Sequence, residues 1–168
     1  AWGRKPSAAR AEAAAQKLGL PVVRLEDGFL RSLEPGAEHP PLSLIWDDEG
    51  IYYDAGQPCR LERLLAQASS LARAERAREG RVSKYNHARE RHYQDLAPYV
   101  LVVDQTAGDA SIGFGQADAS SFEVMLKSAL ERFPGHRGLL KTYPDVVAGR
   151  KQGYFSQSAE AQSPRVTW

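Results

Sequence analysis

Short apolar runs and alanine-rich stretches alternate along the first third of the chain. Residues 8–18 are rich in alanine and precede a glycine, which predicts a helix with a glycine stop. Residues 20–25 form a short β-branched run that predicts a strand. Residues 43–46 and 51–54 predict two further strands, joined as a hairpin around an acidic turn.

The middle of the chain has a helical pattern. Leucines recur at helical spacing from residue 60, and the pattern predicts helices to about residue 97. Gly80 interrupts this stretch, so we expect a separate helix over 84–96. Seven basic and three acidic residues lie between 73 and 91. Such a stretch could bind lipid phosphates or nucleic acid, but it is also typical of a solvated helix face.

The last third alternates between strand and helix. Residues 99–104 form a nearly continuous apolar run, which is typical of a strand buried on both faces of a parallel sheet. Residues 120–133 predict an amphipathic helix, and residues 139–142 predict a short strand. After Gly149 the composition becomes polar, and we expect a loose tail. The alternation of helices and strands predicts the α/β class.

The composition is that of an ordinary globular protein. The 168 residues are 42% hydrophobic and 26% charged, with a net charge of +1. These values exclude a disordered, collagen-like or disulfide-rich chain. No apolar run reaches the roughly 20 residues of a membrane span. A single cysteine, Cys59, cannot form an internal disulfide, so we expect a reduced, cytoplasmic protein. The chain lacks an initiator methionine, and we expect it to be a piece of a longer protein.

Polar residues follow three of the predicted strands, in clusters at residues 26–28, 104–111 and 141–145. In open α/β sheets, ligands bind beyond the carboxyl ends of the strands. The sequence therefore predicts a ligand site at such an edge. The four histidines show no metal-ligand spacing, and one cysteine excludes a cysteine-based zinc site, so we expect no metal cofactor.

Each cluster has a catalytic and an ordinary interpretation. Glu26 and Asp27 could include a general base, if burial of one near the other raises its pKa, or could form a solvated turn. Asp109 could be a nucleophile or base in its small-residue loop, or could simply cap a helix. Lys141 and Thr142 suit a phosphate group, although exposed lysines are common. The residues alone leave these alternatives open.

Taken together, the motifs resemble the bacterial capsule polysaccharide β-Kdo transferases of the KpsC type. The resemblance is collinear over roughly residues 2–154. In the first half it rests on residues 2–7 (WGRKPS), 24–32 (RLEDGFLRS), 41–44 (PLSL) and 50–54 (GIYYD). In the second half it rests on residues 102–106 (VVDQT), 108–112 (GDASI) and 141–145 (KTYPD).

The resemblance implies a GT-B glycosyltransferase module of two Rossmann-like domains with parallel sheets. It implies residues 1–82 as the later part of the first domain, 83–97 as a connecting helix and 98–168 as the start of the second domain. It also implies a retaining enzyme that transfers Kdo from CMP-Kdo to a phosphatidylglycerol-linked acceptor. Such an enzyme would act at the cytoplasmic face of the inner membrane, with the capsule assembly and export machinery and without nucleic acid.

The resemblance also assigns roles to individual residues. Asp109 would be the nucleophile, and Glu26 or Asp27 would be the acid/base for the acceptor hydroxyl. Donor binding would involve Gln105, Ser111, Lys141, Thr142 and Tyr143. The family has histidine where this chain has Tyr143, and a neutral tyrosine cannot supply the same positive charge at pH 7. We therefore expect weaker donor binding or turnover, and no turnover from the isolated chain. The alternative is a non-catalytic module that binds the CMP-sugar or the lipid acceptor.

Overall fold

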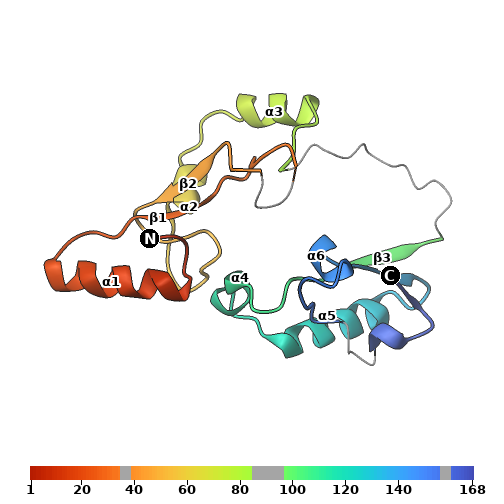
Figure 1. The fold of residues 1–168 in the computed structure, drawn as a ribbon. Helices are drawn as coiled ribbons and strands as arrows, with labels where there is room; N and C mark the ends of the chain where they lie inside the picture. The colour runs from red at the N-terminus through yellow and green to blue at the C-terminus, as the bar shows by residue number, and fades with distance from the viewer. Residues whose placement is uncertain (35–38, 85–96, 156–159) are drawn as a thin grey trace. The chain divides into compact units, whose positions relative to one another are not determined.

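The computed structural model describes residues 1–34, 39–84, 97–155 and 160–168 (Figure 1). The chain divides into two compact units, Ala1–Arg91 and His92–Trp168. Each unit contains helices and its own sheet, which confirms the predicted α/β class. The predicted connecting helix over 83–97 falls almost wholly outside the described residues, so the proposed domain limits stay a prediction.

The N-terminal unit is built around a two-stranded antiparallel sheet. Helix α1 (Pro6–Leu18) begins with a proline and ends at Gly19, which takes the left-handed conformation that glycine favours (φ 63°). Strand β1 (Arg24–Asp27) then pairs with β2 (Leu44–Asp47). Trp2 forms an isolated parallel bridge with Leu25 of β1. The sheet of this unit is therefore antiparallel, and the prediction of a parallel sheet is wrong here.

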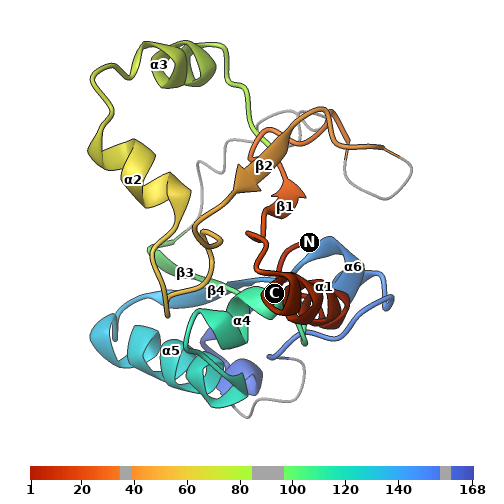
Figure 2. The ribbon, with the colours of Figure 1, turned by 90° about the vertical axis from the view of Figure 1, so that its left-hand side faces the viewer.

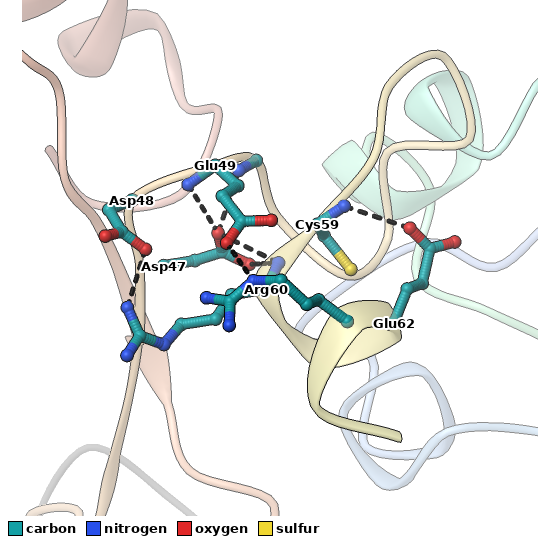
Figure 3. A network of polar contacts seen from close by, with 8 residues as sticks. Asp47, Asp48, Glu49, Cys59, Arg60 and Glu62 are labelled. Atoms are coloured by element: carbon teal, nitrogen blue, oxygen red, sulfur yellow. Dashed lines mark hydrogen bonds and ion pairs between the residues drawn. The ribbon is translucent and has the colours of Figure 1, made fainter. Parts of the chain in front are cut away.

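The predicted hairpin of residues 43–46 and 51–54 is also wrong. Strand β2 pairs back to β1, and residues 51–54 form a turn. The side chain of Asp47, at the end of β2, is 1% exposed and accepts hydrogen bonds from three backbone amides. The donors are Glu49 N (2.9 Å), Gly50 N (2.8 Å) and Arg60 N (3.0 Å). Figure 3 shows how this carboxylate joins the turn to the start of the next helix, so the chain does not fold back as a third strand.

The predicted long helix after residue 60 is broken. Helix α2 (Arg60–Ala66) begins with a capping box, in which Cys59 N donates to Glu62 Oε2 (2.9 Å; Figure 3). Helix α3 (Ala72–Glu79) follows after a break that contains two serines, and Ala72 N donates to Ser70 Oγ (3.3 Å). Serine side chains that bond the backbone compete with helix continuation. Neither helix buries a residue.

The C-terminal unit has a parallel sheet in the order β3-β4-β5. The strands are β3 (Tyr99–Val103), β4 (Arg137–Lys141) and β5 (Val166–Thr167). Helix α5 (Ala119–Arg132) runs along one face of the sheet (Figure 2). The core on that face consists of Val102, Phe122, Leu126, Leu130, Leu140, Phe155 and Ala161.

Two expectations for this unit need correction. On the other face, Leu101 and Val103 are 50% and 52% exposed, so β3 is not buried on both faces in the described part of the chain. The described parts of the tail after Gly149, residues 150–155 and 160–168, are not loose. They contribute the fully buried Phe155, the short helix η1 (Glu160–Gln162) and strand β5, which pairs with β4. The sequence missed these elements because their contacts lie far back along the chain.

Candidate functional site

Two of the three polar clusters lie at the same edge of the parallel sheet. The β3–β4 register sets Val103 opposite Lys141, and Asp104 N donates to Lys141 O (2.9 Å). The loop at 104–111 and the segment at 141–145 therefore both start where these strands end. The third cluster, at residues 26–28, follows β1 in the separate sheet of the N-terminal unit. A single sheet edge thus carries two clusters, and not all three.

Asp104 anchors the first of these loops. Its carboxylate is buried, and Oδ1 accepts from Gln105 N (2.8 Å) and Tyr154 N (3.0 Å). Gln105 is a predicted donor-binding residue. Its side-chain Oε1 accepts a hydrogen bond from Thr106 N (2.8 Å). Asp104 Oδ2 and Thr142 Oγ1, on the neighbouring strand end, are buried and have no hydrogen-bond partner among the residues that the structure describes.

Asp109 lies in the exposed part of the loop and caps a short helix. It precedes α4 (Ala110–Phe114), and its Oδ1 accepts from Ser111 N (2.9 Å) and Ser111 Oγ (2.7 Å). The capping interpretation of Asp109 is therefore what the geometry shows. The carboxylate is also exposed, and both hydrogen bonds found for it among the described residues go to one oxygen. A capping aspartate in this position can still reach a ligand.

The segment at 141–145 presents cations and one aromatic ring. Lys141 is exposed, and Tyr143 is 38% exposed at the start of α6 (Pro144–Val147). Lys151 Nζ lies 5.9 Å from the centre of the Tyr143 ring. Asp145 is bonded to Arg150 (2.6 Å), and this bond lowers the pKa of Asp145 below its usual value. Lys151 Nζ also lies 3.7 Å from Asp145 Oδ2, so Asp145 pairs with both cations, and the exposed Lys141 is the side chain of this segment that best suits an anionic group such as a phosphate.

The two adjacent carboxylates of the N-terminal unit have different partners. Glu26 Oε1 accepts from Tyr53 Oη (3.3 Å), whereas Asp27 Oδ2 forms an ion pair with Arg31 Nε (2.5 Å). Consecutive strand residues point to opposite faces, and neither carboxylate is fully buried. The expected arrangement, burial of one carboxylate beside the other, is therefore not found.

The backbone of Gly3 and Arg4 lies close to the Glu26–Tyr53 hydrogen bond and holds it in place. Tyr53 Oη accepts from Arg4 N (2.9 Å), and the preceding Gly3 has a left-handed φ of +50°. A Cβ at Gly3 would overlap Glu26 Oε1 and come within 2.6 Å of Tyr53 Oη. The backbone of Gly3, in the WGRKPS motif, thus lies directly against the Glu26 side chain. Only glycine fits at this position.

We expect Tyr53 to ionise later than a solvated tyrosine. Burial raises the pKa of Tyr53 from 10.0 to about 12, and the Glu26 carboxylate adds to this effect. Because the folded-state pKa lies above the unfolded value, Tyr53 favours folding fully below pH 10, and this contribution is lost as the pH rises to about 12.

The measurement is an ultraviolet titration of tyrosinate formation in the folded chain. The Tyr53→Phe variant should lose the late step, whereas Tyr99→Phe, at an exposed site on β3, should keep it. A late step that persists in Tyr53→Phe would contradict the prediction.

The sequence did not single out Arg31, Tyr53 or Tyr154. Arg31 and Tyr53 lie within motifs of the resemblance, and their partners identify them only once the fold is known. Tyr154 lies in the segment that the polar composition assigned to a loose tail. Within the described ranges no group of three His, Cys, Asp or Glu side chains could hold a metal ion. No described helix is long and apolar enough to cross a membrane.

Comparison with known proteins shows where the chain is similar. A family model described as "Capsule polysaccharide biosynthesis protein" matches residues 1–94 and 80–167. The capsule polysaccharide modification protein LipA of Neisseria meningitidis serogroup B is 45% identical over 177 residues. That match covers 95% of this chain but 25% of LipA, so the chain spans about a quarter of this relative.

Two solved structures from Thermosulfurimonas dismutans are also similar. The KpsC β-Kdo 2,4 transferase matches 99% of this chain with 41% identity and a TM-score of 0.88, and the match covers 55% of that chain. The KpsC β-Kdo 2,7 transferase matches 86% of this chain with 33% identity and a TM-score of 0.58, covering 47% of that chain.

Proposed function

Because this chain belongs to the family of capsule polysaccharide biosynthesis proteins, we propose that it forms part of a retaining β-Kdo transferase. The family assignment confirms the resemblance that the motifs indicated. The observation that carries the proposal is the match to the 2,4 transferase, which extends over 99% of this chain at 41% identity. The weaker match to the 2,7 transferase favours a 2,4 linkage in the product.

The proposed donor is CMP-Kdo, and the proposed acceptor is a Kdo residue linked to phosphatidylglycerol. The exposed Lys141 and the adjacent Thr142 and Tyr143 would bind near the CMP phosphate. Gln105 and Ser111, in the loop after β3, would line the donor site. The enzyme would act at the cytoplasmic face of the inner membrane together with the capsule assembly and export machinery. A carboxylate nucleophile needs no metal ion, so the reaction would proceed without a cofactor.

The proposed reaction has two displacements. The Asp109 carboxylate attacks the anomeric carbon of Kdo, the bond from that carbon to the CMP phosphate oxygen breaks, and CMP leaves with the electron pair. The acceptor hydroxyl then attacks the same carbon, releases Asp109 and gives its proton to a carboxylate base. Two inversions restore the original configuration, which is the result expected of a retaining enzyme.

Between the two candidate bases, the contacts favour Glu26 over Asp27. Asp27 is held by the Arg31 guanidinium at 2.5 Å, so this carboxylate is already engaged in an ion pair. Glu26 instead accepts a hydrogen bond from a neutral tyrosine hydroxyl, at 3.3 Å. A carboxylate with a neutral donor can take a proton without losing an ion pair.

The proposal is tested by intact-protein mass spectrometry after incubation with CMP-Kdo, and separately with CMP. Two samples are compared: this chain, and a chimera in which it replaces the matched part of the Thermosulfurimonas dismutans 2,4 transferase. We expect a Kdo-sized covalent adduct on the chimera and none on the isolated chain. Transfer without any adduct would contradict the two-step mechanism. CMP binding with neither adduct nor transfer would favour the non-catalytic binding module.

The alternative of a non-catalytic module rests on Tyr143, which stands where the resembling family has histidine. If that difference is a defect, Tyr143→His should raise the transfer rate of the chimera about 10- to 100-fold, because a charged hydrogen bond contributes roughly 1.5–3 kcal/mol. Initial rates at saturating CMP-Kdo measure the effect, with Tyr99→Phe as the control. An unchanged rate would show that tyrosine serves equally well at this position.

A further inference from the structure

We propose that Tyr154 is a positioning residue for the loop that carries Asp109. The inference deepens the proposed function, since it rests on a catalytic role for Asp109. Tyr154 belongs to no motif of the resemblance, and its position in the fold gives it this role. Its backbone, its hydroxyl and its ring each contact a different part of the C-terminal unit.

Three hydrogen bonds join the Asp109 loop to residues 152–154. Tyr154 N donates to Asp104 Oδ1 (3.0 Å), at the point where the loop leaves β3. Ala107 N donates to Gln152 O (2.8 Å), and Gly108 N donates to Tyr154 Oη (3.3 Å). The last of these bonds lies one residue before Asp109. Tyr154 therefore holds both the beginning of the loop and the backbone next to the carboxylate.

The Tyr154 ring is itself fixed by the core. It stacks on Phe122 of α5 with a centroid distance of 4.2 Å and an interplanar angle of 9°. Phe122 is 7% exposed and makes an edge contact with the fully buried Phe155. Because closely packed interiors deform little, the position of Tyr154 Oη follows from the core packing.

The loop needs an external constraint of this kind. Gly108 has a φ of +79°, and a Cβ there would have no neighbour within 4 Å. Both Gly108 and Asp109 are exposed, and the helix that Asp109 caps has only five residues. Loss of the Tyr154 hydroxyl would let water take over the Gly108 amide, so the fold would lose little stability. The backbone at Asp109 would no longer be held in one orientation, because the bond from Gly108 N to Tyr154 Oη would be absent.

Tyr154→Phe isolates the role of the hydroxyl, because phenylalanine keeps the stacking on Phe122. We expect a kcat about tenfold lower in the chimera and an unchanged KM for CMP-Kdo, since misplacement of a reacting group by about 1 Å can reduce a rate by up to about 100-fold. The matched control is Tyr99→Phe, which removes a hydroxyl at the opposite end of β3. Both variants should unfold at the temperature of the unmodified protein.

Hydrogen exchange of the 168-residue chain tests the positioning without any enzyme assay. Residues 105–111 should exchange several-fold faster in Tyr154→Phe than in the unmodified chain or in Tyr99→Phe. Unchanged exchange would overturn the inference, and so would faster exchange with an unchanged kcat if Asp109→Asn is inactive. If Asp109→Asn keeps its activity while exchange is faster in Tyr154→Phe, the proposed nucleophile is wrong and the positioning of the loop stands.

Discussion

Asp109→Asn should reduce Kdo transfer by the chimera at least about 1000-fold and remove the covalent adduct. Loss of a nucleophile has effects of this size or larger, because an amide cannot form the glycosyl bond that the mechanism requires. CMP binding should be retained, because the residues proposed to bind near the CMP phosphate, at 141–143, are unchanged and asparagine can keep the hydrogen bonds to Ser111.

The asparagine variant separates chemistry from folding. Asparagine caps helices about as well as aspartate, so the bonds to Ser111 N and Oγ can persist. Asp109→Ala would lose the cap and about 1 kcal/mol of stability, which would complicate the result. Asp118→Asn is the matched control, because Asp118 is also an exposed aspartate that caps a helix of the same unit. Near-normal turnover in Asp109→Asn would exclude the nucleophile role.

Asp47→Ala should destabilise the N-terminal unit by about 3–5 kcal/mol. The substitution removes the acceptor of three backbone amides. The buried Gly50 amide costs about 1–3 kcal/mol when it is left unsatisfied, and each of the two part-buried bonds to the charged carboxylate contributes up to about 1.5–3 kcal/mol. Typical domains are stable by only about 5–15 kcal/mol, so this loss would be a large share of the total. The variant should also remove the hydrogen bond that links the first residue of α2, Arg60, to the end of β2.

Chemical denaturation followed by tryptophan fluorescence measures this effect, since Trp46 precedes Asp47 in β2. The matched control is Asp48→Ala. Asp48 is exposed, and its bond to Arg60 (2.7 Å), which lowers the pKa of Asp48, is a surface contact. Exposed ion pairs contribute little, so this control should unfold almost as the unmodified chain does. Equal stability of the two variants would show that the Asp47 network is not important.

Local patterns predicted the elements whose signals lie within their own segments. The amphipathic pattern over 120–133 corresponds to α5, and the apolar run over 99–104 corresponds to β3. Gly19 ends α1 as expected, because a left-handed helix stop needs only local backbone. The alternation of helices and strands also suffices to predict the α/β class, since it limits the possible layers.

The errors arise where distant contacts decide the structure. Residues 20–25 contain the β-branched run, yet β1 lies at Arg24–Asp27 because its partners are β2 and the first residues of the chain. The hairpin prediction is wrong because the Asp47 carboxylate binds the backbone amide of Arg60, where α2 begins. The role of Tyr154 could not be foreseen, because its partners lie about 30 to 50 positions earlier.

The sequence placed the candidate site better than it explained the site's geometry. The loop after β3 and the segment after β4 do meet at one edge, as parallel neighbours must. The capping bond between Asp109 and Ser111 links two residues that the resemblance treated separately. The distinct partners of Glu26 and Asp27 depend on Tyr53 and Arg31, whose side chains no pattern along the chain could orient.

The contribution of Phe155 and β5 to the core has a consequence for synthesis on the ribosome. Strands β3 and β4 and helix α5 leave the exit tunnel first, and their apolar residues then lack the aromatic ring and the last strand that complete them. Translation adds roughly 5–20 residues per second, so this half-built sheet persists for a second or more. During that time the nascent chain exposes the apolar surface of α5 and of the sheet that Phe155 later covers.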